Sequence, residues 1–264
     1  MTTYVATDAA AYERSMGRWS RMLAAEFVRE CGLPAGASLL DAGCGTGALA
    51  EAILLRDPTA RIAGIDISEA FVGAAQARVP GAAFRVGDVM HLVDADGSYD
   101  AALSLLVLQF VPDRVRALRE LRRVTRKGGL VAVAMWDFIG GFPFLRSFMD
   151  TVAALLPDEG EAFRARYHGD AIGAPGRMSA LFAEAGLDAA ERDIAIRQTL
   201  SSFSDWWEPW ELGQGIAGAF VAALDVPQRD AVREAARRAY LGGGSDGPRS
   251  FIAVARLAAA RVPG

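Results

Sequence analysis

The sequence predicts an α/β fold in which a doubly wound, mostly parallel sheet of about seven strands carries helical cap inserts. Short apolar runs alternate with helical patterns from about residue 20 to 136, and this alternation is typical of repeated β-α-β units. A glycine-rich turn at 43–47 joins the first apolar run to a helix, as in sheets that bind ligands at their strand ends. Hydrophobic residues make up 52% of the chain, which is enough for a sizeable core.

The first half of the chain contains the parallel strands, each a short apolar run bounded by turn residues. We expect these strands at 38–42, 61–66, 82–86, 99–107 and 130–136. The run at 99–107 is almost continuously apolar, which indicates a central strand covered on both faces. We expect the intervening helices at 22–31, 48–55, 68–78 and 112–124, with Ser68 capping the third of them.

The regular alternation stops at Asp137, where helical patterns become longer and strands fewer. Two further strands are expected at 187–200 and 250–258, with helical inserts at 140–186 and 203–246. Because both inserts lie next to strands of the second half, we expect them to cover a site at the strand carboxyl ends. We interpret 1–264 as a single domain, with residues 1–21 as an N-terminal cover segment.

Composition excludes several classes of function. With 28 basic and 32 acidic side chains the net charge is −4, and the sequence contains no basic stripe that could neutralise a nucleic-acid backbone. Cys31 and Cys44 form neither a disulfide framework nor a metal cluster, so no metal site is expected. The N-terminus lacks a signal-peptide pattern and the longest apolar run, 101–111, is too short for a bilayer. We therefore expect a cytoplasmic protein that binds neither nucleic acid nor membrane.

The sharpest motif is LLDAGCGTG at 39–47, where a strand leads through alternating glycines into a helix. Glycines in this position permit a positive φ and allow a ligand to approach the backbone closely. Gly43, Gly45 and Ala48 satisfy the G-x-G-x-x-G/A spacing of dinucleotide-binding folds. The same segment also fits G-x-G-x-G preceded by an acid, a pattern that suits S-adenosylmethionine (SAM). The loop spacing therefore leaves two classes of ligand open.

Three acidic residues at strand ends favour SAM. Asp41 lies so close to the loop that it would repel a pyrophosphate, but it suits a ligand that carries an ammonium and a sulfonium. Asp66 ends the second strand, where a carboxylate accepts hydrogen bonds from ribose hydroxyls. Asp88 ends the third strand, where a carboxylate can accept from an exocyclic adenine amine. Asp66 fits both ligands, whereas Asp41 and Asp88 favour SAM.

Several ordered segments resemble the class I SAM-dependent methyltransferases, particularly the UbiE-like small-molecule group. The resemblance covers roughly residues 12 to 137 and fades beyond them. In chain order, the matching segments are YERSMGRWSR (12–21), LLDAGCGTG (39–47), IDIS (65–68), GDV (87–89), LLVLQFVPD (105–113) and RVTRKGGL (123–130). The resemblance implies a Rossmann-like sheet with an antiparallel last strand at 250–258 and methyl transfer from SAM to a small-molecule acceptor.

The resemblance also implies which residues bind the cofactor. In the sheet these are Asp41, Gly43, Cys44, Gly45, Gly47, Asp66, Ile67, Asp88, Val89 and Leu105. The N-terminal segment would add Tyr12, Met16, Trp19 and Arg21, of which Arg21 could reach the methionyl carboxylate and Trp19 could face the sulfonium. Of the two histidines, His91 is interpreted as a surface turn residue and His168 as a structural residue. No catalytic residue is assigned, because a sulfonium is already an activated electrophile and the protein mainly aligns the acceptor.

Three other functions stay open on the sequence. An NAD(P)-dependent oxidoreductase would use the spacing of Gly43, Gly45 and Ala48, with Asp41 as the feature against it. A protein of the same fold could catalyse a reaction other than methylation, such as a cyclisation, with SAM ordering the pocket. A non-catalytic binding module would not need the full set of cofactor motifs. The sequence neither requires nor excludes a homodimer, and it does not identify the acceptor.

Overall fold

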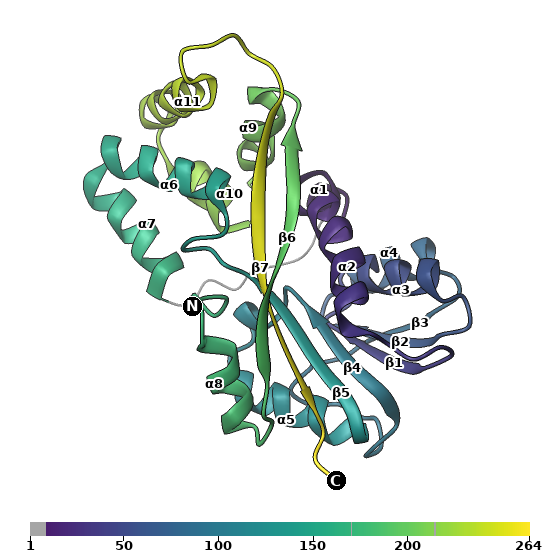
Figure 1. Ribbon diagram of the computed structural model, residues 1–264. Helices are drawn as coiled ribbons and strands as arrows, with labels where there is room; N and C mark the ends of the chain where they lie inside the picture. The colour runs from purple at the N-terminus through teal and green to yellow at the C-terminus, as the bar shows by residue number, and fades with distance from the viewer. Residues whose placement is uncertain (1–8, 170, 214) are drawn as a thin grey trace. The chain divides into compact units, whose positions relative to one another are not determined.

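Seven strands form one sheet in the computed structural model, which describes residues 9–169, 171–213 and 215–264 (Figure 1). Their order is β3-β2-β1-β4-β5-β7-β6. The pairs β2–β3, β1–β2, β1–β4 and β4–β5 are parallel, whereas β5 and β7 are antiparallel. The predicted fold class and its antiparallel last strand are therefore confirmed. The strands are β1 Ser38–Ala42, β2 Arg61–Asp66, β3 Ala83–Val86, β4 Tyr99–Leu105, β5 Thr125–Trp136, β6 Ala190–Leu200 and β7 Arg249–Arg261.

Helices cover both faces of the parallel part of the sheet, with α5 and α8 on one face and α2, α3 and α4 on the other (Figure 1). The predicted cap at Ser68 is confirmed, since its side chain accepts from the Phe71 N–H. The helix expected from residue 112 begins at Arg114, and Asp113 caps it by accepting from the Arg116 N–H. The helices of this part are α1 Ala9–Tyr12, the π-helix η1 Glu13–Gly17, α2 Arg18–Cys31, α3 Ala48–Arg56, α4 Glu69–Arg78, the 3₁₀ turn η2 Leu108–Phe110, α5 Arg114–Val124 and α8 Arg177–Glu184.

The predicted strand ends differ from the observed ones where tertiary contacts intervene. Strand β4 ends at Leu105, two residues earlier than predicted, because Leu106 adopts a left-handed backbone conformation (φ 65°). Strand β5 begins at Thr125 and not at residue 130, since Thr125 already pairs with Tyr99 across an irregularity in the ladder. An apolar run in the sequence predicts neither the early end of β4 nor the early start of β5.

The chain divides into two compact units, and the division does not follow the predicted inserts. The sheet unit comprises residues up to Trp136 together with Ile172–Ile194 and Ala255–Gly264, and the insert unit comprises Asp137–Ala171 and Ala195–Val254. Helix α8 was expected in the first insert, but it packs on α5 within the sheet unit. Its Met178 and Phe182 are fully buried in the core of that unit, which fixes the helix there.

The insert unit is built around aromatic side chains. Phe148 lies 4.4 Å from Trp210 and 5.9 Å from Phe163 between ring centroids, and Trp206 and Trp207 are also buried. Trp206, Trp207 and Trp210 are therefore core residues of this unit. Its helices are α6 Pro143–Leu155, α7 Pro157–Gly169, α9 Phe203–Glu211, α10 Gly215–Ala223 and α11 Val226–Leu241. Within the described ranges, no helix is both long enough and apolar enough to cross a membrane.

Candidate functional site

The glycine loop lies between β1 and α3, at the carboxyl end of the sheet. Gly43, Gly45 and Gly47 all have positive φ values, of 81°, 52° and 88°. The N–H groups of Gly43 and Cys44 both donate to the Ile65 carbonyl at 2.8 Å, which fixes the loop to the end of β2. The alternating glycines are therefore required by the backbone, because side chains rarely tolerate this conformation.

The space around each glycine shows whether the glycine is needed for packing or leaves room for a ligand. A Cβ at Gly43 would lie 2.3 Å from a methyl carbon of Val107, and one at Gly47 would lie 3.2 Å from Val79. At Gly45 a Cβ would meet no atom of the described residues within 4 Å, its two chain neighbours apart. Gly43 and Gly47 are thus needed for packing, whereas Gly45 borders open space that a ligand can use.

Asp41 is a buried carboxylate without a partner. Its side chain is 1% exposed, and neither oxygen makes a hydrogen bond within the described part of the chain. Burial and the nearby Asp66 carboxylate raise the pKa of Asp41 to about 7, while the Ala50 backbone acts in the opposite direction without reaching the geometry of a hydrogen bond. A cation bound beside Asp41 would compensate this charge.

Asp66 holds the loop and the start of α4 together. One of its oxygens accepts from the Gly45 N–H and the other from the Ser68 N–H, both at 2.9 Å. Burial raises the pKa of this carboxyl, and the hydrogen bonds oppose that rise. The following Ile67 side chain is 77% exposed, an apolar surface next to a polar strand end. A sugar and a planar base bound here would meet both kinds of surface.

Asp88 lies in a turn after β3. One of its oxygens accepts from the Met90 N–H at 2.8 Å, and the other lies 3.0 Å from the Nδ1 of His91. His91 is exposed, which agrees with its interpretation as a surface turn residue, and Val89 is buried. The three predicted acids thus stand at the ends of β1, β2 and β3, which are neighbours in the sheet.

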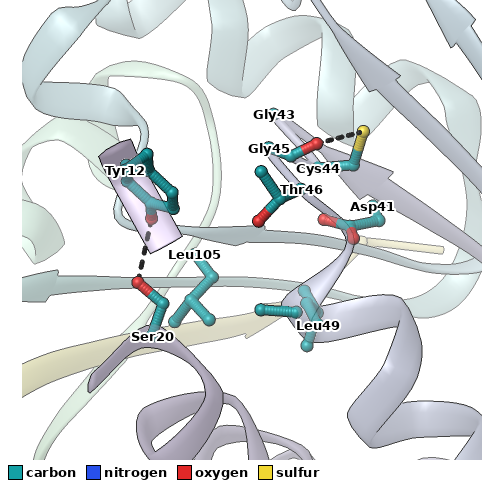
Figure 2. A pocket seen from close by; sticks show the side chains of 10 residues that line it. Tyr12, Ser20, Asp41, Gly43, Cys44, Gly45, Thr46, Leu49 and Leu105 are labelled. Carbon is teal, nitrogen blue, oxygen red and sulfur yellow. Dashed lines mark hydrogen bonds between the residues drawn. The ribbon is translucent and has the colours of Figure 1, made fainter. Parts of the chain in front are cut away.

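A cavity of the sheet unit opens beside the glycine loop (Figure 2). Its lining residues are Tyr12, Ser20, Asp41, Gly43, Cys44, Gly45, Thr46, Ala48, Leu49 and Leu105. Six of them were predicted to bind SAM, whereas Ser20, Thr46 and Leu49 were not, and Ala48 was named only for the dinucleotide spacing. Thr46 and Ala48 stand within or next to the glycine motif, which was the available signal. Ser20 and Leu49 reach the cavity only through the packing of α2 and α3.

The other predicted cofactor residues lie outside this lining: Met16, Trp19, Arg21, Gly47, Asp66, Ile67, Asp88 and Val89. Trp19 is buried, with the Arg18 guanidinium 4.2 Å from its ring centroid. Cys44 donates only a weak contact to the Gly45 carbonyl at 3.7 Å, and burial raises the pKa of its thiol far above the usual range. Cys44 is therefore a packing residue of the loop, without the thiolate character of a nucleophile.

The N-terminal segment, residues 9–17, is fastened over the loop through Tyr12 and Glu13. The Tyr12 ring lies 5.3 Å from that of Phe71, and its hydroxyl pairs with Ser20 at 2.9 Å (Figure 2). The Glu13 carboxylate accepts from Arg78 at 2.9 Å and also from the side chains of Thr46 and Arg21. Arg21 is thus paired within the protein.

The charge of Glu13 is stabilised by these donors. Burial raises its pKa, but the hydrogen bonds from Arg78, Thr46 and Arg21 outweigh burial and lower it from 4.5 to about 2. The contribution of Glu13 to stability is therefore complete above about pH 4.5 and is lost as the pH falls towards 2.

We expect Glu13→Gln to loosen the N-terminal segment. Glutamine removes the charge that Arg78 and Arg21 neutralise, and hydrogen bonds to charged groups are the stronger ones. Amide hydrogen exchange of residues 9–17 should accelerate several-fold at pH 7. Glu26→Gln is the matched control, because Glu26 forms an ion pair with Arg29 within α2 (2.6 Å) and makes no hydrogen bond or ion pair with residues 9–17 in the described part of the chain. Equal exchange in both variants would contradict the fastening role of Glu13.

Comparison with known proteins gives a family match and several relatives. Residues 40–133 match the family described as "Methyltransferase domain". A trans-aconitate 2-methyltransferase of Variovorax paradoxus is 34% identical over 114 residues, covering 43% of this chain and 44% of that protein. The chain spans about half the length, or less, of the curated relatives it matches first.

Solved structures share the fold at low sequence identity. A phosphoethanolamine N-methyltransferase 2 of Haemonchus contortus, solved with S-adenosylhomocysteine (SAH), has a TM-score of 0.60 and 18% identity, covering 100% of this chain and 58% of that chain. The [4+2]-cyclase SpnF has a TM-score of 0.53 and 22% identity, covering 99% and 88%. At these identities the likeness concerns the fold alone.

Proposed function

We propose that the chain is a class I SAM-dependent methyltransferase that transfers a methyl group from SAM to a small-molecule acceptor, because residues 40–133 match a methyltransferase domain and the relatives of this region are methyltransferases. The observation that carries the proposal is the buried Asp41 carboxylate, which has no hydrogen-bond partner in the described part of the chain and lies in the wall of a cavity that Gly45 leaves open. A cation is the group that such a carboxylate needs, and SAM carries both an ammonium and a sulfonium.

The predicted cofactor residues fit complementary parts of SAM. Asp41 and the cavity at the glycine loop fit the methionyl end, with Tyr12 and Leu105 as apolar walls. Asp66 would accept hydrogen bonds from the ribose while it holds the Gly45 amide, and Ile67 would pack on the adenine. Asp88 and Val89 would define the far edge of the adenine site. This assignment differs from a dinucleotide site, where a charged Asp41 would face a pyrophosphate.

SAM supplies a methyl group on a positively charged sulfur, which makes the methyl carbon an electrophile. The protein's own part is to bind the cofactor, to hold the acceptor in line with the methyl carbon and to exclude water. The Asp41 carboxylate favours the positively charged cofactor electrostatically. A general base is required only where the acceptor must lose a proton, and no residue is assigned to that role.

We expect Asp66→Asn to lower the affinity for SAH more than tenfold while the protein stays folded. The amide has a single acceptor oxygen, so it cannot serve both the Gly45 and Ser68 N–H groups and a ribose. Hydrogen bonds to charged groups contribute about 1.5–3 kcal/mol, which corresponds to at least a tenfold change. The measurement is isothermal titration calorimetry with SAH, alongside circular dichroism.

Asp57→Asn is the matched control for this experiment. Asp57 also accepts from two backbone amides, those of Gly36 (2.7 Å) and Thr59 (2.9 Å), but it does not line the cavity. Its replacement should leave the SAH affinity unchanged. Unchanged affinity in a folded Asp66→Asn protein would remove the ribose assignment.

The proposal is tested by ligand binding and by transfer of label. In a thermal-shift assay, a ligand at 100 times its dissociation constant stabilises by roughly 2.7 kcal/mol, so SAM and SAH should raise the melting temperature and NAD should not. Transfer of a radiolabelled methyl group to a panel of acceptors then identifies the substrate. Trans-aconitate belongs on that panel because a relative is named for it. A shift by NAD alone would favour the oxidoreductase.

Because SpnF shares this fold, the experiment also tests a second candidate function, a cyclisation in which SAM only orders the pocket. SAM binding without label transfer to any acceptor would favour it. The finer proposals are that the protein works in the cytoplasm, on free small molecules and not on nucleic acid. The predicted roles of residues 1–21, 140–186 and 203–246 as covers stay predictions.

A further inference from the structure

Leu106, directly after β4, has an uncommon backbone conformation. Its φ is 65°, and among the residues that the structure describes it is the only one other than glycine with a positive φ. Leucine lacks the local hydrogen bonds that help asparagine or aspartate in this region, so the conformation costs free energy. A strained residue persists only where the surrounding structure holds it, and such residues gather at functional sites.

The neighbours of Leu106 connect it to the cavity. Before it, the Leu105 side chain forms part of the cavity wall. After it, the Val107 side chain fills the position that a Cβ of Gly43 would occupy, since the built Cβ lies 2.3 Å from a Val107 methyl carbon. The Leu106 N–H donates to the Ala134 carbonyl at 2.8 Å, which anchors the turn to β5. The left-handed turn thus directs the two adjacent side chains to the cavity wall and the glycine loop.

The Leu106 side chain itself has no comparable role. It is half-buried, does not line the cavity and is not part of the core cluster that includes Val107 as a neighbour. The contribution of this position therefore comes from its backbone conformation.

We propose that Leu106 is a positioning residue for the cofactor, whose left-handed backbone holds Val107 against Gly43 and keeps Leu105 in the cavity wall. The inference rests on the proposed function, because it concerns the same SAM site. Asp41 and Gly45 form one part of that site, and the turn after β4 fixes the shape of another. A change that moves the turn would alter the loop without touching either residue.

The test is a series of substitutions at Leu106, with SAH affinity measured by calorimetry. Leu106→Gly and Leu106→Asn remove the apolar side chain but permit a left-handed backbone, so SAH affinity should stay within about twofold of the wild type. Leu106→Val keeps an apolar side chain but disfavours this conformation, so affinity should fall about tenfold or more. Leu212→Val is the control, a half-exposed leucine with φ −79°.

A second variant keeps the test decisive if Leu106→Val does not fold. Val107→Ala empties the position beside Gly43, and it should weaken SAH binding several-fold while circular dichroism shows a folded protein. Loss of affinity in the glycine and asparagine variants, or wild-type affinity in folded Val107→Ala, would overturn the role of the turn. Failure of the wild-type protein to bind SAH would instead overturn the proposed function itself.

Discussion

A Gly45→Val variant should lose SAM and SAH affinity by at least about a hundredfold. Gly45 has a φ of 52°, which a β-branched residue rarely adopts, and its amide is held by the Asp66 carboxylate. Apart from its two chain neighbours, no described residue has an atom within 4 Å of a Cβ at this position, so the valine side chain would extend into the open space beside Asp41. Loss of backbone approach and steric overlap with the ligand act in the same direction.

The same substitution at Gly32 separates strain from ligand binding. Gly32 caps the end of α2 with a φ of 56°, and a Cβ there also meets no atom within 4 Å. Both variants should therefore melt at a lower temperature by similar amounts, roughly the 1 kcal/mol or more that a left-handed side chain costs. Only Gly45→Val should lose SAH binding in calorimetry. Similar SAH affinities in the two variants would show that the loop does not hold the cofactor.

The second large effect is expected for Asp41→Asn, with opposite signs for stability and for binding. The wild-type carboxylate is buried and has no hydrogen-bond partner among the described residues, and burial together with Asp66 raises its pKa from 3.8 to about 7. Asparagine removes that charge with little change in volume, so stability at pH 8 should rise, on the order of 3 kcal/mol. The SAH affinity should fall about tenfold, because the ligand's ammonium loses its counter-charge. Thermal denaturation and calorimetry give the two numbers.

The pH dependence identifies the group responsible. Because folding raises the pKa of Asp41, its ionisation opposes folding fully above about pH 7, and the penalty disappears as the pH falls towards 3.8. The stability advantage of Asp41→Asn should therefore shrink between pH 7 and 4. At Asp57 the same substitution should change the stability in the opposite direction. Hydrogen bonds from Thr59 and Gly36 lower the pKa of Asp57, so Asp57→Asn should be less stable than the wild type at neutral pH. An Asp41→Asn protein that is less stable at every pH would mean that the carboxylate has a partner.

Local sequence determined the framework of this protein. The strands β1 and β2 match their predicted bounds, and Ser68 caps the helix that it was expected to cap. Apolar runs, glycine placement and helix capping each involve only a few consecutive residues, so they can be recognised in the linear sequence. For the same reason the glycine loop and the acids at the ends of the first strands could be read before any fold was known.

Tertiary structure alone decided how that framework becomes a site. Glu13 meets Thr46 and Arg78, which are 33 and 65 residues away in the chain, and no local pattern predicts that meeting. The same holds for α8, whose apolar face would suit either unit until its packing on α5 assigns it to the sheet unit. The unpaired state of Asp41 and the left-handed backbone of Leu106 are also set by their surroundings. Charge burial and backbone strain depend on every neighbour in space, whereas the sequence orders neighbours only along the chain.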